Sequence, residues 1–292
     1  MAEIRGATWG DLDAVCDLLA ARSRAAFGVS EVESAHVGAR WEMPSFEVGR
    51  DNVVAVDAGN VVGYASLLTT QDANVAAADA AVNDALLARV EERARERGFE
   101  WIHVTAVPED EPLHALVQRA GFVREREIWR MWKHLDGDEA APDWRDDVTV
   151  RTYAPEDGER VHALLDEAYS GWDDGYVRLA HDDWLAFMTA HDDFDPDLWF
   201  LAERDGELVA AALHWKEHRG DGWVKDIVVR ETERGRGLGN ALLLHAFRAY
   251  AARGAKRVGL KVDSTNPTGA PRLYERVGME IDRRYGIWKK AL

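Results

Sequence analysis

The sequence predicts a mixed α/β protein made of two consecutive domains that share one plan, and three observations support this. The chain has 292 residues, which is long for one domain and sufficient for two. Short motifs found at residues 119–133 return at residues 276–289. An acidic segment that contains glycine and proline, residues 136–143, separates the two copies and is typical of a linker.

The repeat is clearest at the end of each half. The first copy reads Arg-Ala-Gly-Phe at 119–122 and Trp-Lys at 132–133, and the second reads Arg-Val-Gly-Met at 276–279 and Trp-Lys at 288–289. The offset between matching residues is 156 or 157. Because a constant offset indicates a repeated fold, we expect a first domain over residues 1–138 and a second over residues 146–292.

Strands and helices alternate in the second half. We expect a strand at 148–154, helices at 157–170 and 181–190, and strands at 198–204, 207–216 and 222–230. A long amphipathic helix follows at 238–253, with an apolar face made of Leu242, Leu243, Ala246, Phe247 and Tyr250. A strand at 256–263, a short helix at 268–277 and a final pair of strands complete the domain. The first half follows the same order.

Composition and charge exclude several classes of partner. The net charge of −17 argues against a nucleic acid, because phosphates need a basic face. No apolar run approaches the roughly 18 residues of a membrane helix, and residues 1–6 lack the apolar stretch of a signal peptide. The single cysteine, Cys16, cannot form an internal disulfide. We therefore expect a cytoplasmic protein with no membrane partner, and no feature indicates an oligomeric state.

The strongest local signal is a glycine-rich turn between a strand and a helix. The strand ends near Val229, glycines follow at 235, 237 and 239, and the long helix begins. Glycines let backbone N–H groups approach an anion without a Cβ in the way, and the helix N-terminus adds unpaired N–H groups. Arg234 and Arg236 add guanidinium groups. The segment predicts a pyrophosphate site, although it is neither a dinucleotide fingerprint nor a P-loop; the alternative is a flexible turn.

Arg-Gly-Arg-Gly-Leu-Gly at 234–239 resembles the cofactor loop of the GNAT superfamily of N-acetyltransferases. Asn266 and Leu-Tyr-Glu-Arg-Val-Gly-Met at 273–279 resemble that family's Asn…Leu-Tyr-Glu-x-x-Gly-Phe segment. The resemblance covers the second half in motifs and the first half in architecture. It implies two tandem GNAT folds, each a mixed, mostly antiparallel sheet flanked by helices, and transfer of acetyl from acetyl-CoA to a primary amine of a small molecule. The tandem arrangement and the length also resemble the mycothiol synthases.

The resemblance also implies roles for individual residues. The strand formed by Ile227, Val228 and Val229 would lie along the pantetheine, and Asn266 would contact the pantetheine arm or orient the short helix. The pyrophosphate would be held by the segment made of Arg234, Gly235, Arg236, Gly237, Leu238, Gly239 and Asn240. Tyr274 matches the tyrosine that protonates the departing thiolate. A phenol, with a pKa of about 10 against about 8.5 for a thiol, suits that task. Spacing alone favours a core tyrosine on an apolar helix face beside Leu273 and Val277, and the family match favours the catalytic role.

The general base is left open. Many members of the family carry a glutamate early in the fourth strand, where this sequence has Trp223. Asp226 resembles the acid of a Glu-Asp pair in some polyamine acetyltransferases, whose glutamate is replaced here by Lys225. Asp226 is predicted to deprotonate the amine, directly or through water, or to bind a cationic acceptor. The alternative is an ion pair with Lys225 or a nearby arginine. The other candidates are Glu203, His214 and Asp263.

An acidic segment precedes the strands of the second half. Its aspartates would either attract an ammonium group or cap helices and turns. They are Asp173, Asp174, Asp182, Asp183, Asp192, Asp193, Asp195 and Asp197. The triplet His-Asp-Asp occurs at 181–183 and again at 191–193, but a spacing of ten residues without a supporting cluster is no metal motif, and acetyl transfer needs no metal. We predict no metal site.

The first half lacks the residues that the second half would use. At an offset of 156, loop residues 234–239 fall on Ala-Asp-Ala-Ala-Val-Asn at 78–83, which places Asp79 where an anion should bind. At an offset of 157, Val117 stands where Tyr274 is expected. We therefore expect a structural first half and a catalytic second half. Three alternatives remain: mycothiol biosynthesis with a cysteinyl pseudodisaccharide as acceptor, protein or peptide acetylation, and an acyl-CoA sensor without turnover.

Overall fold

The computed structural model describes residues 2–32, 34–170, 178–218 and 220–292. The chain forms two compact units. Unit 1 comprises Met1–Glu127, Asp182–Ala190 and Tyr285–Leu292, and unit 2 comprises Ile128–His181 and His191–Arg284. Each unit is a mixed α/β structure in which antiparallel strand pairs predominate, as the sequence predicts. Within the described ranges, no helix has both the length and the apolar character that a membrane span requires.

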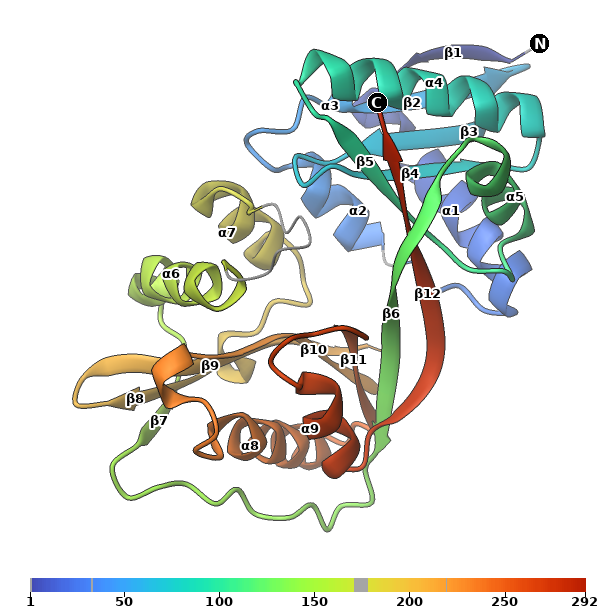
Figure 1. Cartoon of the computed structure of the whole chain (residues 1–292). Helices are drawn as coiled ribbons and strands as arrows, with labels where there is room; N and C mark the ends of the chain where they lie inside the picture. The colour runs from blue at the N-terminus through green and yellow to red at the C-terminus, as the bar shows by residue number, and fades with distance from the viewer. Residues whose placement is uncertain (1, 33, 171–177, 219) are drawn as a thin grey trace. The chain divides into compact units, whose positions relative to one another are not determined.

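Unit 1 contains a sheet in the order β1-β2-β3-β4-β5-β12. Its strands are β1 (Glu3–Gly6), β2 (Asn52–Asp57), β3 (Asn60–Leu67), β4 (Asp72–Ala77), β5 (Trp101–Ala106) and the end of β12 (Glu280–Ala291). Its helices are η1 (Trp9–Asp11), α1 (Leu12–Phe27), α2 (Ser34–Trp41), α3 (Val48–Asp51), α4 (Ala80–Glu96), α5 (Glu111–Arg119) and most of α7 (His181–Thr189). Figure 1 shows α4 lying along this sheet.

Unit 2 contains a sheet in the order β6-β11-β10-β9-β8-β7. Its strands are the end of β6 (Val123–His134), β7 (Thr149–Thr152), β8 (Phe200–Arg204), β9 (Glu207–His218), β10 (Asp221–Val229) and β11 (Arg257–Asp263). Its helices are η2 (Pro155–Asp157), α6 (Gly158–Tyr169), η3 (Pro196–Leu198), η4 (Glu231–Glu233), α8 (Leu238–Ala252) and α9 (Ala270–Arg276). In Figure 1, α6 and α8 lie on opposite faces of this sheet, and both contact β9 and β10.

The sheet of each unit is completed by a strand from the other half of the sequence. In unit 1, β12 pairs with β5 from Gly286 opposite Ala106 to Ala291 opposite Trp101. In unit 2, β6 pairs with β11 from Ile128 opposite Asp263 to His134 opposite Arg257. The final pair of strands predicted from the sequence is wrong: Glu280–Ala291 is one strand, and its second half pairs with β5 without interruption.

The same arginine–aspartate ion pair occurs just before the first long helix of each half of the sequence. Arg5 Nη1 donates to Asp11 Oδ2 at 2.8 Å, and Arg151 Nη1 donates to Asp157 Oδ2 at 2.6 Å. In both cases the same aspartate oxygen also accepts from the backbone N–H three residues earlier, at 2.8 and 2.9 Å. Hydrogen bonds from the arginines hold the pKa of both aspartates below the usual value. The repeat therefore extends to the start of the first helix in each unit.

The core of unit 2 lies between the sheet and α8. The apolar face predicted from helical spacing is buried in full: Leu242, Leu243, Ala246, Phe247 and Tyr250 are each 0% exposed. Burying a side chain of this size contributes about 1.5–3 kcal/mol. This packing fixes the N-terminus of α8 beside the end of β10, which is where the candidate site lies.

Candidate functional site

The centre of the site is the place where β10 and β11 part. These strands are parallel, and their pairing in the described chain is limited to Asp221 with Arg257, Gly222 with Val258 and Trp223 with Gly259. Beyond Trp223, β10 continues to Val229, and over this stretch of the described chain it pairs with β9 alone. The backbone groups on the other side of this stretch can therefore bond an extended polar molecule.

A β-bulge in β10 directs an acidic side chain to the face of the sheet that α6 covers. Val224 lies opposite His214 but Asp226 lies opposite Leu213, so that Lys225 is the extra residue. The Tyr169 hydroxyl, at the end of α6, donates to Asp226 Oδ1 at 3.0 Å. Lys225 Nζ lies 3.4 Å from Asp226 Oδ2. Asp226 is thus held by a phenol on one oxygen and an ammonium group on the other.

Tyr274 belongs to α9, which follows β11. Its side chain is 6% exposed, and burial, followed by the charge of Asp226, raises the pKa of its phenol above the ordinary value. The phenol therefore stays protonated near neutral pH and can donate a proton. Helix α9 packs closely on the start of α8, because a Cβ added at Gly239 would lie 3.2 Å from Leu273 Cδ2.

The glycine loop, residues 230–237, connects β10 to α8. Gly235 and Gly237 have φ values of +76° and +88°, and a Cβ at either would meet nothing within 4 Å, so the backbone conformation alone explains these glycines. Gly237 is the N-cap of α8 and, being glycine, has no side chain to cap this helix. The first N–H groups of α8, at Leu238, Gly239 and Asn240, lack intrahelical acceptors and can bind an anion.

The polar side chains of the predicted cofactor site bond within the protein. Arg234 Nε donates to Val229 O at 3.2 Å, and Arg236 Nη1 lies 3.3 Å from Glu233 Oε2. Asn266 Oδ1 accepts from the backbone N–H of Thr268 at 2.9 Å and from its hydroxyl at 2.6 Å. This turn leads into α9. Asn266 therefore helps to place the helix that carries Tyr274.

The other candidates for the general base have different surroundings. Glu203 Oε1 accepts from Arg151 at 2.8 Å and from Arg160 at 3.0 Å. His214 is 0% exposed, and burial lowers its pKa to about 3. Asp263 Oδ1 accepts from the N–H and the hydroxyl of Thr265 at 2.8 and 2.7 Å. The charge of Asp226 contributes to the raised pKa of the Tyr274 phenol.

In unit 1, the place where β4 and β5 part is occupied by a side chain of the protein. Pairing of β4 with β5 is limited to Asp72 with His103 and Ala73 with Val104. Just past this point, Arg22 Nη1 donates to Val75 O at 2.8 Å. Only residues 78 and 79 connect β4 to α4, where unit 2 has residues 230–237.

Asp79 caps helix α4 of unit 1, and its Oδ1 accepts from Val82 N at 3.0 Å. The sequence offset places Asp79 opposite Gly235, whereas the structure gives it the N-cap position that Gly237 holds in unit 2. The anion position at this helix start is thus occupied by the protein's own carboxylate. Val117 is fully buried.

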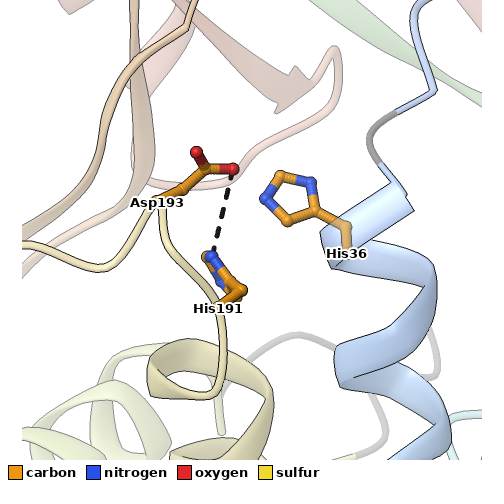
Figure 2. Close-up of side chains that lie close together, drawn as sticks. All are labelled: His36, His191 and Asp193. Carbon is orange, nitrogen blue, oxygen red and sulfur yellow. Dashed lines mark ion pairs between the residues drawn. The ribbon is translucent and has the colours of Figure 1, made fainter.

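The acidic segment lies partly outside the described residues, which do not include Asp173 and Asp174. Of the others, Asp195 caps η3 by accepting from Asp197 N at 3.0 Å, and Asp183 accepts from Ser45 N at 2.8 Å. The contact of Asp195 fits the capping interpretation, whereas Asp183 bonds a distant backbone N–H and caps no helix. In the second His-Asp-Asp triplet, His191 Nδ1 lies 3.9 Å from Asp193 Oδ2 (Figure 2).

Two residues beside the site, Tyr169 and Glu233, are not found by sequence analysis. Tyr169 lies 57 positions from Asp226, and the bulge at Lys225 leaves no pattern in the sequence. Glu233 is visible only as one of several acids before the loop, yet it is 5% exposed. The position of Glu233 directly before the glycine loop was the signal in the sequence that could have drawn attention to it.

Known proteins resemble this chain over nearly its whole length. The profile of the acetyltransferase (GNAT) family matches residues 158–279. A mycothiol acetyltransferase of Kineococcus radiotolerans is 34% identical over 92% of this chain and 90% of its own, and one of Amycolatopsis mediterranei is 31% identical over 90% and 91%.

Solved structures show the same fold. A GCN5-related N-acetyltransferase from Sphaerobacter thermophilus matches 99% of this chain and 95% of its own with a TM-score of 0.75 and 28% identity. A tandem GNAT protein from the clavulanic acid biosynthesis pathway matches 100% and 98% with a TM-score of 0.73 and 17% identity. The chain therefore belongs to the GNAT family of N-acetyltransferases and has the tandem GNAT architecture.

Proposed function

We propose that this N-acetyltransferase transfers acetyl from acetyl-CoA to a primary amine of a small molecule, and that unit 2 carries the reaction. The observation that supports this most is the placement of Tyr274 and Asp226 where β10 and β11 part, beside a helix whose N-cap is a glycine. Unit 1, whose helix α4 is capped by Asp79, has a structural role.

The residues of unit 2 fit the parts of acetyl-CoA. The glycine loop and the first turn of α8 supply backbone N–H groups for the pyrophosphate. Ile227, Val228 and Val229 of β10 are not paired with β11. Their backbone groups on that side bond the amides of the pantetheine. Asn266 supports this site through its turn into α9.

The transfer needs a base, an oxyanion donor and an acid. Asp226 accepts a proton from the acceptor ammonium, directly or through water, and the free amine attacks the thioester carbonyl carbon. A backbone N–H of β10 stabilises the oxyanion, and loss of such a donor typically costs about 3–4 kcal/mol. The C–N bond forms, and as the C–S bond breaks Tyr274 donates its proton to the departing thiolate sulfur. Burial of Tyr274 keeps that proton in place until then. The nitrogen passes its surplus proton to the Tyr274 phenolate, directly or through water, which leaves a neutral amide, and Asp226 releases the first proton to solvent.

A mycothiol precursor is the second, more specific candidate for the acceptor. Two relatives that match nearly the full chain carry the name mycothiol acetyltransferase. The acceptor would then be the cysteinyl amine of a pseudodisaccharide. Lys225, 3.4 Å from Asp226, disfavours polyamines, because a cation already occupies one side of the carboxylate.

The test is a panel of amines supplied with acetyl-CoA and followed by thiol release. The panel contains a cysteinyl pseudodisaccharide, an amino sugar, spermidine and a lysine peptide, and the Tyr274→Phe variant serves as control. We expect acetylation of a small amine that the variant performs far more slowly. Acetylation of the peptide alone would contradict the small-molecule proposal, and binding of acetyl-CoA without turnover of any amine would favour a sensor.

A further inference from the structure

We infer that Glu233 and Arg204 form a positioning pair that fixes the glycine loop and holds Arg236 ready for the pyrophosphate. The inference rests on the proposed function, because it assigns the loop to acetyl-CoA. Glu233 is the last residue of η4 and directly precedes the Arg-Gly-Arg-Gly segment.

The pair is bidentate and nearly buried. Arg204 Nη1 donates to Glu233 Oε2 at 2.6 Å, and Arg204 Nη2 donates to Glu233 Oε1. The side chain of Glu233 is 6% exposed and that of Arg204 is 25% exposed. Because Arg204 ends β8, this bond ties the start of the loop to the sheet. Two parallel bonds of this kind fix direction as well as distance.

Arg236 is held by the same carboxylate but faces water. Its Nη1 lies 3.3 Å from Glu233 Oε2, and its side chain is 44% exposed. Two guanidinium groups share one carboxylate, so the group of three carries a net positive charge beside the loop. The backbone on the upstream side is also fixed, since Glu233 N donates to Arg230 O at 2.9 Å and Arg234 N donates to Glu231 O at 3.2 Å.

Two physical effects of Glu233 on acetyl-CoA have opposite signs. As a negative charge near the pyrophosphate, Glu233 should weaken binding, so that Glu233→Gln would tighten it. As a group that orients Arg236 and the loop, Glu233 should strengthen binding, so that the same substitution would weaken it. Glutamine keeps the size of the side chain, and the sign of the change therefore separates the two effects.

The experiment measures binding of acetyl-CoA to the full chain by calorimetry. We expect Glu233→Gln to weaken binding about tenfold, the size of a lost charge-assisted hydrogen bond. The matched control is Glu203→Gln, since Glu203 is the neighbour of Arg204 on β8 and is also paired with arginines, Arg151 and Arg160, away from the loop. That variant should bind acetyl-CoA like the wild type.

Acetylpantetheine, which lacks the pyrophosphate, separates positioning from general damage. Its binding, followed by ligand-observed NMR, should be the same in the wild type and in Glu233→Gln. Equal or tighter binding of acetyl-CoA by the variant, or equal weakening of both ligands, would overturn the inference.

Should Glu233→Gln not fold because Arg204 is left without its partner, the double variant Arg204→Gln, Glu233→Gln removes both charges and should show the same selective weakening. Unchanged binding of acetyl-CoA by that double variant would also overturn the inference. A wild type that binds no acetyl-CoA would instead contradict the proposed function itself.

Discussion

The Tyr169 hydroxyl donates a hydrogen bond to Asp226 Oδ1 over 3.0 Å, across 57 positions of the sequence. Tyr169 is the last residue of α6, and Asp226 follows the bulged residue of β10. The direction of the carboxylate therefore depends on a helix that covers the opposite face of the sheet from α8.

Asp226→Asn should lower kcat/KM for the acceptor amine by about 100-fold, the lower end of general base effects. Tyr169→Phe leaves the carboxylate in place but frees one oxygen, so we expect a smaller loss of about tenfold at unchanged affinity for acetyl-CoA. Steady-state rates at saturating acetyl-CoA measure both. A wild-type rate in Asp226→Asn would remove Asp226 from the mechanism.

Tyr274→Phe should lower kcat by at least about tenfold while the affinity for acetyl-CoA changes little, because the hydroxyl acts mainly in the transition state. Single-turnover measurements with a good acceptor isolate the chemical step. Val277→Ala, at the C-cap of the same short helix, is the control for packing damage. An unchanged chemical rate in Tyr274→Phe would make Tyr274 a core residue only.

Gly237→Ala should weaken acetyl-CoA binding, because alanine disfavours the φ of +88° that the N-cap of α8 adopts. The left-handed conformation costs an alanine about 1–2 kcal/mol. Gly206→Ala is a matched control, because Gly206 has a φ of +82°, a Cβ there also meets nothing within 4 Å, and it lies in the turn between β8 and β9. Both variants should lose stability in denaturant, and only the first should lose affinity in calorimetry. Equal affinity in the two variants would count against the glycine loop as the pyrophosphate site.

His214 should make unit 2 sensitive to acid. Its folded pKa is lowered to about 3 by burial, so between pH 6.5 and 3 the unfolded chain binds a proton there that the folded chain does not. Stability is lost as the pH falls through this window, at up to about 1.4 kcal/mol per pH unit. His214→Leu should reduce that slope in urea unfolding at pH 7 and pH 5. A slope equal to that of the wild type would contradict this account.

Local patterns in the sequence were sufficient for the elements around the site. Helical spacing gives the buried face of α8, and the alternating glycines give the turn before it. These features depend on neighbours within a few residues. The bond from Tyr169 to Asp226 and the pair of Arg204 with Glu233 depend on a bulge and on strand order, and these arise from tertiary structure.

Alignment of the two halves fails where their lengths differ. An ungapped offset cannot show that the connection before α4 is shorter than the one before α8, and so it gives Asp79 the wrong counterpart. The last strand is also beyond local reasoning. The sequence predicts a pair of strands here, and only the pairing of residues 286–291 with β5 shows one continuous strand.

The exchange of terminal strands limits how this protein can be recombined. Residues 128–134 complete the sheet of unit 2, and residues 285–291 complete the sheet of unit 1. A chimera that joins residues 1–138 of one homologue to the remainder of another would therefore replace a strand in both sheets at once. Both halves must therefore be exchanged together. A mutation in either terminal strand must be compatible with the neighbouring strand of its sheet, which lies in the other half of the sequence.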